Sequence, residues 1–168
     1  VREARIRLSA DWLGRLIPRR GALILPVSKQ DMEEIYDILM ALEPAAAAKL
    51  AERKPSEQEL APLREAVEAM EAAEDAGNLL DWAEADDQFH DAFLKLQGNG
   101  RIIAMVSILN DQAHRARMMT LSARSIPVQS TREHREILEN LSSGNASGAR
   151  EAFQKHRQRA ARELLSLM

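Results

Sequence analysis

The sequence predicts an all-α protein, an antiparallel bundle of about six helices preceded by a short helix and a β-hairpin. Apolar residues recur at spacings of three and four through most of residues 28–168, which is the period of an amphipathic helix. Turn or capping residues separate these stripes, and no strand-like alternation lies between them. The 168 residues include only 7 glycines and 6 prolines, so long helices with short connections are expected.

The first 27 residues differ from the rest in pattern. Residues 1–8 have the spacing of a short helix, and residues 22–27 form an apolar run that we expect to pair, as a strand, with the segment near Leu16. Residues 18–21, Pro-Arg-Arg-Gly, supply a turn between them. Such a segment is too small to bury its own core, so we expect it to be the end of a domain that begins earlier.

The charge changes at the same place. Six arginines against two acidic residues give residues 1–27 a net charge of +4, whereas the whole chain carries −3, so residues 28–168 carry −7. A basic head on an acidic body suggests that only the head meets a polyanion such as DNA. A solvated, arginine-rich helix would give the same charge, and charge alone does not separate the two explanations.

Residues 28–168 are expected to form a separate, wholly helical domain. Ser28 can cap the first helix, with Asp31 as its reciprocal partner, and Ser56 can cap the second. A shorter helix is expected over residues 131–141. Breaks between helices are expected at Lys54-Pro55, Gly77-Asn78, Gly98-Asn99-Gly100, Pro127 and Gly144-Asn145.

The composition and the missing motifs exclude several classes of function. The chain has no cysteine, which excludes disulfides, thiolate nucleophiles and cysteine-based zinc sites. No apolar run is long enough for a membrane span, and no signal-peptide pattern is present, so we expect a cytoplasmic protein without a membrane partner. The sequence contains no G-x-S-x-G, P-loop, dinucleotide-binding glycine pattern or H-E-x-x-H.

Polar residues occupy inward positions where the helical stripes call for apolar ones. Asp86 interrupts one stripe, and His134 and His156 face inward on two later helices. His90 follows Asp86 by four residues, about one turn, so both side chains project the same way. A buried carboxylate is costly unless it is paired or bound to a cation. Three imidazoles and one carboxylate would suit zinc, nickel, cobalt or manganese.

Each of these residues also has a simpler explanation. An inward histidine is commonly a hydrogen-bonded core residue, and Asp86 with His90 would also fit a pair on a helix surface. That three of the four histidines fall on inward faces together with an aspartate favours a metal site without excluding those alternatives. The fourth histidine, His114, lies at the edge of its stripe, where we expect it at a boundary or in a pocket wall, outside the ligand set.

A group of arginines leaves a second question open. Arg115, Arg117 and Arg124 could hold an anionic ligand. Solvated charges on a helix surface would produce the same pattern, and we favour that interpretation because arginine is rarely buried.

Several short motifs, in this order, resemble those of GntR-type transcription regulators of the FadR subfamily, whose helical effector domain is called FCD. The start V-R-E-A and the turn R-R-G at 19–21 resemble the end of that family's winged helix-turn-helix domain. The segments D-x-x-F-H at 86–90, G-N at 98–99 and E-H-x-x-I at 133–137, with His156, resemble the FCD pattern. Together they span nearly the whole chain.

The resemblance implies a metabolite-responsive, DNA-binding regulator and not an enzyme. It implies a divalent metal, expected to be zinc, nickel or manganese, held by Asp86, His90, His134 and His156. It also implies a small effector, expected to be an organic acid, bound beside the metal, and a homodimer that binds palindromic operator DNA. By the same resemblance the DNA-contacting residues are Arg2, Arg20 and Gly21.

Two departures from the family pattern bear on this expectation. Many members carry an effector-pairing arginine three residues before a Leu-Glu pair, and here that position is Leu39, before Leu42-Glu43. The sequence also begins within the part that resembles the recognition helix, so operator binding is expected to need residues before Val1.

Two other functions remain open at this stage. A site of three histidines and one carboxylate with free positions could activate water, as in a helical-bundle metalloenzyme. The chain could also be a structural dimerisation bundle in which the histidines are core residues. Metal analysis separates the second alternative from the others, and turnover assays separate the enzyme from the regulator.

Overall fold

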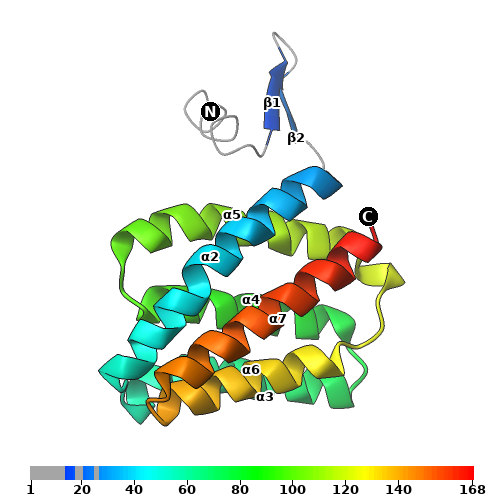
Figure 1. Cartoon of the computed structure of the whole chain (residues 1–168). Coiled ribbons are helices and arrows are strands. Elements are labelled where there is room, and N and C mark those ends of the chain that lie inside the picture. Colours follow the sequence, from blue (N-terminus) through cyan, green and yellow to red (C-terminus); the bar gives the residue numbers. More distant parts are fainter. Residues whose placement is uncertain (1–13, 18–20, 25–26) are drawn as a thin grey trace.

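The computed structural model describes residues 14–17, 21–24 and 27–168, and it confirms the all-helical bundle (Figure 1). Within this part of the chain, six α-helices follow a pair of β-strands. The elements are β1 Gly14–Ile17, β2 Gly21–Ile24, α2 Lys29–Arg53, α3 Glu57–Asp75, α4 Leu79–Leu96, α5 Gly100–Met119, the 3-10 turn η1 Leu121–Ala123, α6 Val128–Ser142 and α7 Ala146–Ser166.

The expected hairpin is present, with a small shift. β1 and β2 pair antiparallel, with Gly14 opposite Ile24 and Ile17 opposite Gly21. The second strand therefore begins at Gly21, one residue before the expected start. The helix expected over residues 1–8, and with it Arg2, lies outside the described residues, as does Arg20.

Side-chain caps define where the helices begin. Ser28 and Ser56 each form the reciprocal box that the sequence predicts, with Asp31 and Glu59 respectively. Asparagines cap three further helices: Asn78 for α4, Asn99 for α5 and Asn145 for α7. A glycine with positive φ lies before each of these asparagines: Gly77 at 66°, Gly98 at 76° and Gly144 at 72°.

One boundary differs from the expectation. The helix expected to begin near Thr131 begins at Val128. Pro127 occupies the N-cap position, and its carbonyl oxygen accepts hydrogen bonds from the backbone N–H groups of Ser130 and Thr131. Because a proline needs no backbone partner for its nitrogen, it starts a helix where the sequence pattern suggested only a loop.

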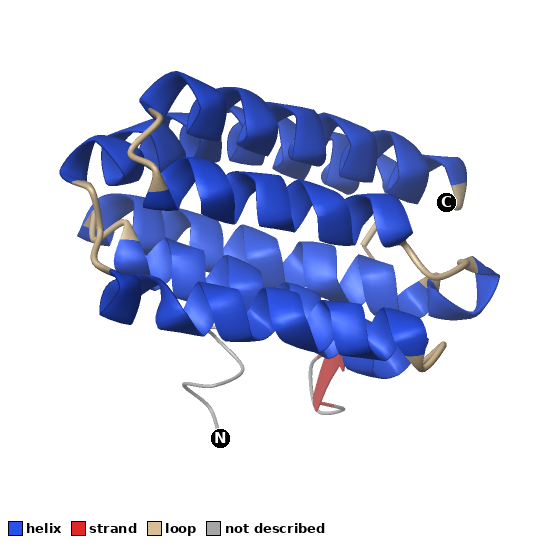
Figure 2. Ribbon diagram, turned by 90° about the horizontal axis from the view of Figure 1, so that it is seen from below, coloured by secondary structure: helices blue, strands red, loops and turns tan. Residues whose placement is uncertain are grey.

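The helices lie side by side in an antiparallel bundle with loops at both ends (Figures 1 and 2). α2 packs along α7, α3 along α4, and α6 against both α3 and α7. α5 packs on α4 and α2. None of the helices in the described segments is long and apolar enough to cross a membrane.

Two apolar clusters form the core. One joins α2, α3, α4, α6 and α7, with Phe89, Phe93 and Phe153 among its largest members. The other joins α2, α4, α5 and α7 and includes Met32 and Leu164. The same helices also bury a set of charged and polar side chains, which the apolar clusters do not account for: Glu43, Asp86, His90, Asn110, Arg117, Glu133, His134, His156 and Arg157.

Candidate metal centre

Three histidines from three helices meet in the interior. His90 on α4, His134 on α6 and His156 on α7 have exposed fractions of 2%, 0% and 1%. The Nε2 atom of His90 lies 3.4 Å from the Nε2 atom of His134 and 3.4 Å from that of His156. A tetrahedral zinc ion with bonds of about 2.0–2.1 Å holds its nitrogen ligands roughly 3.4 Å apart. Both pairs that include His90 thus have the separation that such an ion requires, and all three nitrogens lie within 4.8 Å of one another.

Asp86 completes the group that the sequence singled out. It lies one turn before His90 on α4, and its Oδ1 atom is 3.8 Å from His90 Nε2 and 3.5 Å from His134 Nε2. Asp86 is only 3% exposed, and its Oδ2 atom has no hydrogen-bond partner. The alternative of a helix-surface pair is therefore wrong, because both members are buried.

Two of the histidines have hydrogen bonds that suit metal ligands. Nδ1 of His134 lies 2.8 Å from the carbonyl oxygen of Ser130, and Nδ1 of His156 lies 3.1 Å from a carboxylate oxygen of Glu133. Each partner is an acceptor, so each neutral ring carries its proton on Nδ1 and presents a lone pair at Nε2. Outer acceptors of this kind fix the tautomer of metal-binding histidines.

His90 is held differently. Its Nδ1 atom lies 3.2 Å from Nη2 of Arg157, which is a donor, so Nδ1 accepts and the neutral ring carries its proton on Nε2. For Nε2 of His90 to bind a metal, the proton must be on Nδ1 and the contact with Arg157 must lengthen. His134 and His156 therefore already have the tautomer that binds a metal, whereas His90 must first move its proton to Nδ1.

Arg157 belongs to a buried network that the sequence analysis missed. Its Nε and Nη2 atoms donate to the two carboxylate oxygens of Glu43 at 2.5 and 2.8 Å, and Nη2 also lies 3.0 Å from Oδ1 of Asn110. Arg157 and Glu43 are both completely buried. The network joins α2, α5 and α7 around the back of His90. The sequence offered one signal for this network, because Glu43 is a charged residue on the apolar face of α2.

The electrostatics leave Asp86 ionised and the histidines neutral. Burial raises the pKa of Asp86, but Arg117, whose Nη2 atom lies 3.2 Å from Oδ2, and the neighbouring histidines and Arg157 lower the pKa by more. Burial lowers the pKa of His134 to about 4 despite the opposing charge of Asp86. Burial and nearby cations lower the pKa of His90 and His156 well below the usual value. Carboxylate and neutral imidazole are the metal-binding forms.

A small cavity adjoins these residues. It has a volume of about 20 Å³, which is room for about one water molecule. Asp86, His90 and His156 form part of its wall, and the remaining lining residues are Tyr36, Trp82, Arg117, Arg124, Pro127, Ser130, Arg157, Arg159, Ala160 and Glu163. Four arginines at one cavity make it a place where an anion can be held.

The interpretation of the arginine group as solvated surface charge is wrong for two of its members. The side chains of Arg117 and Arg124 are each only 8% exposed, and both line the cavity. Arg117 lies against Asp86 of α4 and Arg124 lies near Glu163 of α7, and the helical period of α5 alone does not reveal either neighbour. His114 lies apart, with its Nδ1 atom 3.2 Å from a carboxylate oxygen of Asp87 and its side chain 27% exposed.

Acid is expected to destabilise the protein when a chelator is present. Unfolded histidines titrate near 6.5, whereas folded His134 titrates at about 4. Between these values the unfolded chain binds more protons, so the free energy of unfolding falls by about 1.4 kcal/mol per pH unit for each such histidine as pH decreases. His134 alone contributes about 3 kcal/mol over this window. Urea unfolding at pH 7, 6 and 5 measures the slope, and a pH-independent midpoint would contradict it.

Comparison with protein families identifies most of the chain. The model of the FCD domain matches residues 34–159. This range contains all four candidate metal ligands and most of the cavity wall.

Curated proteins similar to this chain are named as HTH-type transcriptional regulators. An HTH-type transcriptional regulator in the TAR-I ttuE-ttuC' intergenic region of Agrobacterium vitis is 43% identical over 96 residues, which cover 56% of this chain and 56% of the relative. The regulator YdhC of Bacillus subtilis is 27% identical over 93% of this chain and 70% of its own length. The transcriptional repressor RspR of Escherichia coli is 25% identical over 94% and 69%.

Solved structures show the same fold. McbR/YncC of E. coli matches 100% of this chain and 84% of its own chain, with a TM-score of 0.87 and 22% identity. A GntR regulator from Rhodococcus sp. RHA1 matches 98% of this chain and 78% of its own, with a TM-score of 0.79.

These comparisons decide between the classes of function that the sequence left open. The relatives are transcriptional regulators, a class without enzymatic activity, so the metalloenzyme alternative is not favoured. The family match covers well over half of the chain, and the solved regulators named above share its fold. The chain belongs to the FCD-domain family.

Proposed function

We propose that residues 28–168 form a sensing domain that binds one divalent metal ion through Asp86, His90, His134 and His156. The observation that carries this proposal is the set of three buried imidazole nitrogens, all within 4.8 Å of one another, beside a buried carboxylate. Zinc, nickel and manganese all accept this donor set. Bound there, the metal would act as a Lewis acid that attracts an anionic oxygen.

The proposed effector is a small organic acid bound beside the metal. The cavity wall combines the candidate ligands Asp86, His90 and His156 with four arginines, which favours a carboxylate. Because the cavity has room for only about one water molecule, an effector must open it further. Such opening is a way for effector binding to alter the packing of α5, α6 and α7.

The proposed output is binding to operator DNA as a homodimer. We assign residues 1–27 to the end of a winged helix-turn-helix domain, in which Arg2 contacts base edges and Arg20 and Gly21 lie at the wing tip. The basic charge of this segment, against the acidic remainder, supports the assignment. In a dimer, a shift of the sensing domains would change the spacing of the two recognition helices relative to their half-sites.

DNA binding tests this assignment in a protein that carries a complete winged helix. Arg2→Ala is expected to weaken operator binding by about 1–3 kcal/mol, and Arg20→Ala is expected to weaken it through the wing. The reason is that an arginine inserted into a groove of DNA combines hydrogen bonds to bases with attraction to phosphates. Fluorescence anisotropy at fixed salt measures both. Arg101→Ala, an exposed arginine on α5, serves as the control and should leave affinity unchanged. Unchanged binding in both head variants would refute the DNA-binding role of this segment.

A further inference from the structure

The donors and acceptors of the three buried histidines match one another without a metal. His134 and His156 carry their protons on Nδ1, where each meets an acceptor, so each presents a lone pair at Nε2. His90 carries its proton on Nε2, and this atom lies 3.4 Å from both lone pairs. The proton thus lies between the nitrogen atoms that a metal would join. The histidines therefore have a hydrogen-bonded state that competes with metal binding.

The guanidinium of Arg157 favours this hydrogen-bonded state. Its Nη2 atom lies 3.2 Å from Nδ1 of His90 and can only donate, so it favours the tautomer with a lone pair on Nδ1 and the proton on Nε2. A metal at Nε2 requires the opposite tautomer, in which the N–H of Nδ1 would face an N–H of Arg157. Two donors that face each other both lack an acceptor, which costs free energy in a buried place. Metal binding at His90 and its contact with Arg157 therefore oppose each other.

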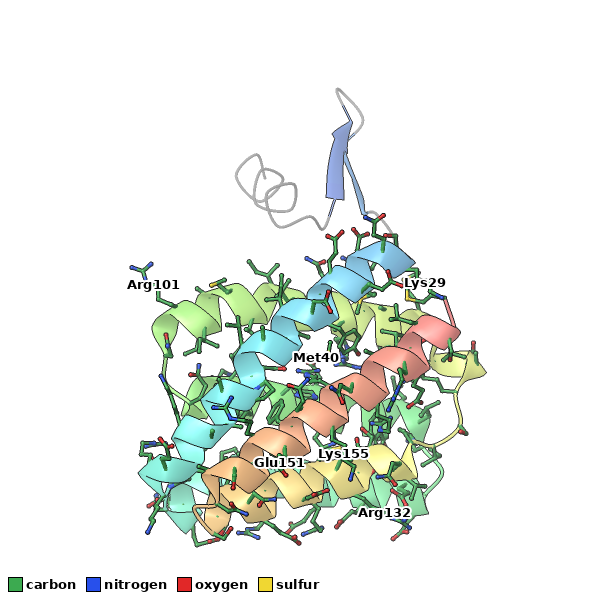
Figure 3. All side chains as sticks on the ribbon, in the orientation of Figure 1. Lys29, Met40, Arg101, Arg132, Glu151 and Lys155 are labelled. Atoms are coloured by element: carbon green, nitrogen blue, oxygen red, sulfur yellow. The ribbon has the colours of Figure 1, made fainter. Side chains whose placement is uncertain are left out.

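Arg157 is held next to this histidine by two other helices. Glu43 on α2 accepts from its Nε and Nη2 atoms, and Asn110 on α5 accepts from Nη2. The side chain of Arg157 is only 1% exposed, whereas Glu151 and Lys155 of the same helix lie at the surface (Figure 3). A buried charge with several hydrogen bonds keeps a fixed geometry. The guanidinium is therefore a fixed donor and not a side chain that turns away freely.

We propose that Arg157 limits the metal affinity of the site by holding His90 in the tautomer whose Nε2 atom cannot bind a metal. This proposal rests on the metal site proposed above, and it makes Arg157 a positioning residue that acts on the metal through His90. When a metal binds, the proton on Nε2 leaves to solvent and Nδ1 takes up another, so the ring stays neutral while the contact with Arg157 opens.

The size of the effect follows from the other contacts of the same atom. Nη2 of Arg157 lies 2.8 Å from Glu43, 3.0 Å from Asn110 and 3.2 Å from His90, so its two N–H groups serve three acceptors. The contact with His90 is the longest of the three and therefore the weakest. We expect it to lower metal affinity by about 10-fold, the effect of one modest hydrogen bond.

Replacing Glu43 and Arg157 together separates this role from a structural one. The variant Glu43→Leu/Arg157→Met removes two opposite charges, so the net charge near the histidines stays the same while Nδ1 of His90 loses its donor. Apolar replacements of a buried ion pair commonly retain the fold, and circular dichroism verifies it. Zinc affinity, measured by competition with a fluorescent indicator, is expected to rise by about 10-fold. Replacing a residue that only supports the packing of the site would lower the affinity instead.

A second arginine–glutamate pair supplies the matched control. Nε and Nη2 of Arg135 on α6 donate to both carboxylate oxygens of Glu71 on α3, each at 2.6 Å. Arg135 directly follows the candidate ligand His134, as Arg157 follows His156, but its side chain is 38% exposed. The variant Glu71→Leu/Arg135→Met contains the same two substitutions and should leave the zinc affinity unchanged.

Nitrogen NMR of the imidazole rings tests the tautomer in the unaltered chain and decides the question should the double variant fail to fold. Without metal, His90 should be protonated at Nε2, and zinc should move its proton to Nδ1. The signals missing from His90→Gln identify this ring. A metal-free His90 protonated at Nδ1, or a zinc affinity of Glu43→Leu/Arg157→Met no higher than that of the unaltered chain, would overturn the role of Arg157 alone. Absence of zinc binding to the unaltered chain and to both double variants would overturn the metal site and this proposal together.

Discussion

Replacing Arg157 by methionine is expected to lower the free energy of unfolding by about 3–5 kcal/mol. Arg157 is completely buried, and its partner Glu43 has no exposed surface. The substitution leaves a carboxylate in the interior without the two hydrogen bonds that it now accepts. An unpaired buried charge is among the most destabilising changes that a fold can undergo. For a domain of this size, the melting temperature should fall by about 10 °C or more.

A control variant is needed to separate the effect of losing the ion pair with Glu43 from the effect of replacing any arginine of α7 by methionine. Arg150→Met, at an exposed residue of the same helix, is the matched control and should change stability by less than about 0.5 kcal/mol. Both variants are compared by thermal unfolding with a chelator present, so that metal affinity does not contribute. An Arg157→Met variant as stable as Arg150→Met would show that the ion pair contributes nothing.

A second substitution checks the cause. Adding Glu43→Leu to Arg157→Met removes the stranded carboxylate, and apolar replacements of a buried ion pair are often neutral or stabilising. The double variant is therefore expected to recover most of the lost stability. Failure to recover would indicate that the packing of the arginine, and not its charge, matters at this position.

The fold could be predicted because helical period and capping are local properties of the sequence. Ser28 with Asp31, and Ser56 with Glu59, mark helix starts through hydrogen bonds within four residues. The start of α6 was misplaced because the cap there is Pro127, whose role depends on backbone geometry rather than on a side-chain bond.

The candidate site was predictable in part for the same reason. Asp86, His134 and His156 interrupt apolar stripes, so the period alone places them inside, and the structure brings them together with His90. Glu43 interrupts a stripe in the same way and was overlooked.

Other site residues could not be found from local pattern. Arg157 follows an inward histidine directly and is buried only because Glu43, 114 residues away, faces it. Arg124 lies on an irregular connection, where no period indicates which side chains point inward. Residues that meet only through tertiary packing have no regular spacing in the sequence, so a periodic pattern cannot reveal them.

Zinc is expected to raise the melting temperature of the chain, and His134→Ala is expected to lower zinc affinity on the order of 100-fold. Structural zinc sites in proteins have binding free energies of about 10–16 kcal/mol, so one of four ligands accounts for roughly 3 kcal/mol. His134 is the most buried of the three histidines, and its Nε2 atom lies 3.5 Å from Asp86 and 3.4 Å from His90. Removing it deletes one donor and separates α6 from the site.

The stabilisation follows from mass action, because the unfolded chain does not preform the site. Zinc at about 1,000 times its dissociation constant adds about 4 kcal/mol, which corresponds to about 10 °C for a domain of this size. Thermal unfolding with zinc and with a chelator measures the difference, and competition with a fluorescent zinc indicator measures affinity. In His134→Ala most of the zinc-dependent shift should disappear.

His114→Ala is the matched control, since His114 pairs with Asp87 and is 27% exposed, apart from the three clustered histidines. It should retain the zinc affinity and the thermal shift of the unaltered chain. The two variants together decide between a metal site and a core of hydrogen-bonded histidines. In a metal site the loss is specific to His134 and depends on zinc. In a hydrogen-bonded core His134→Ala would destabilise the protein equally with zinc and with chelator, because the bond from His134 to the carbonyl of Ser130 is lost in both.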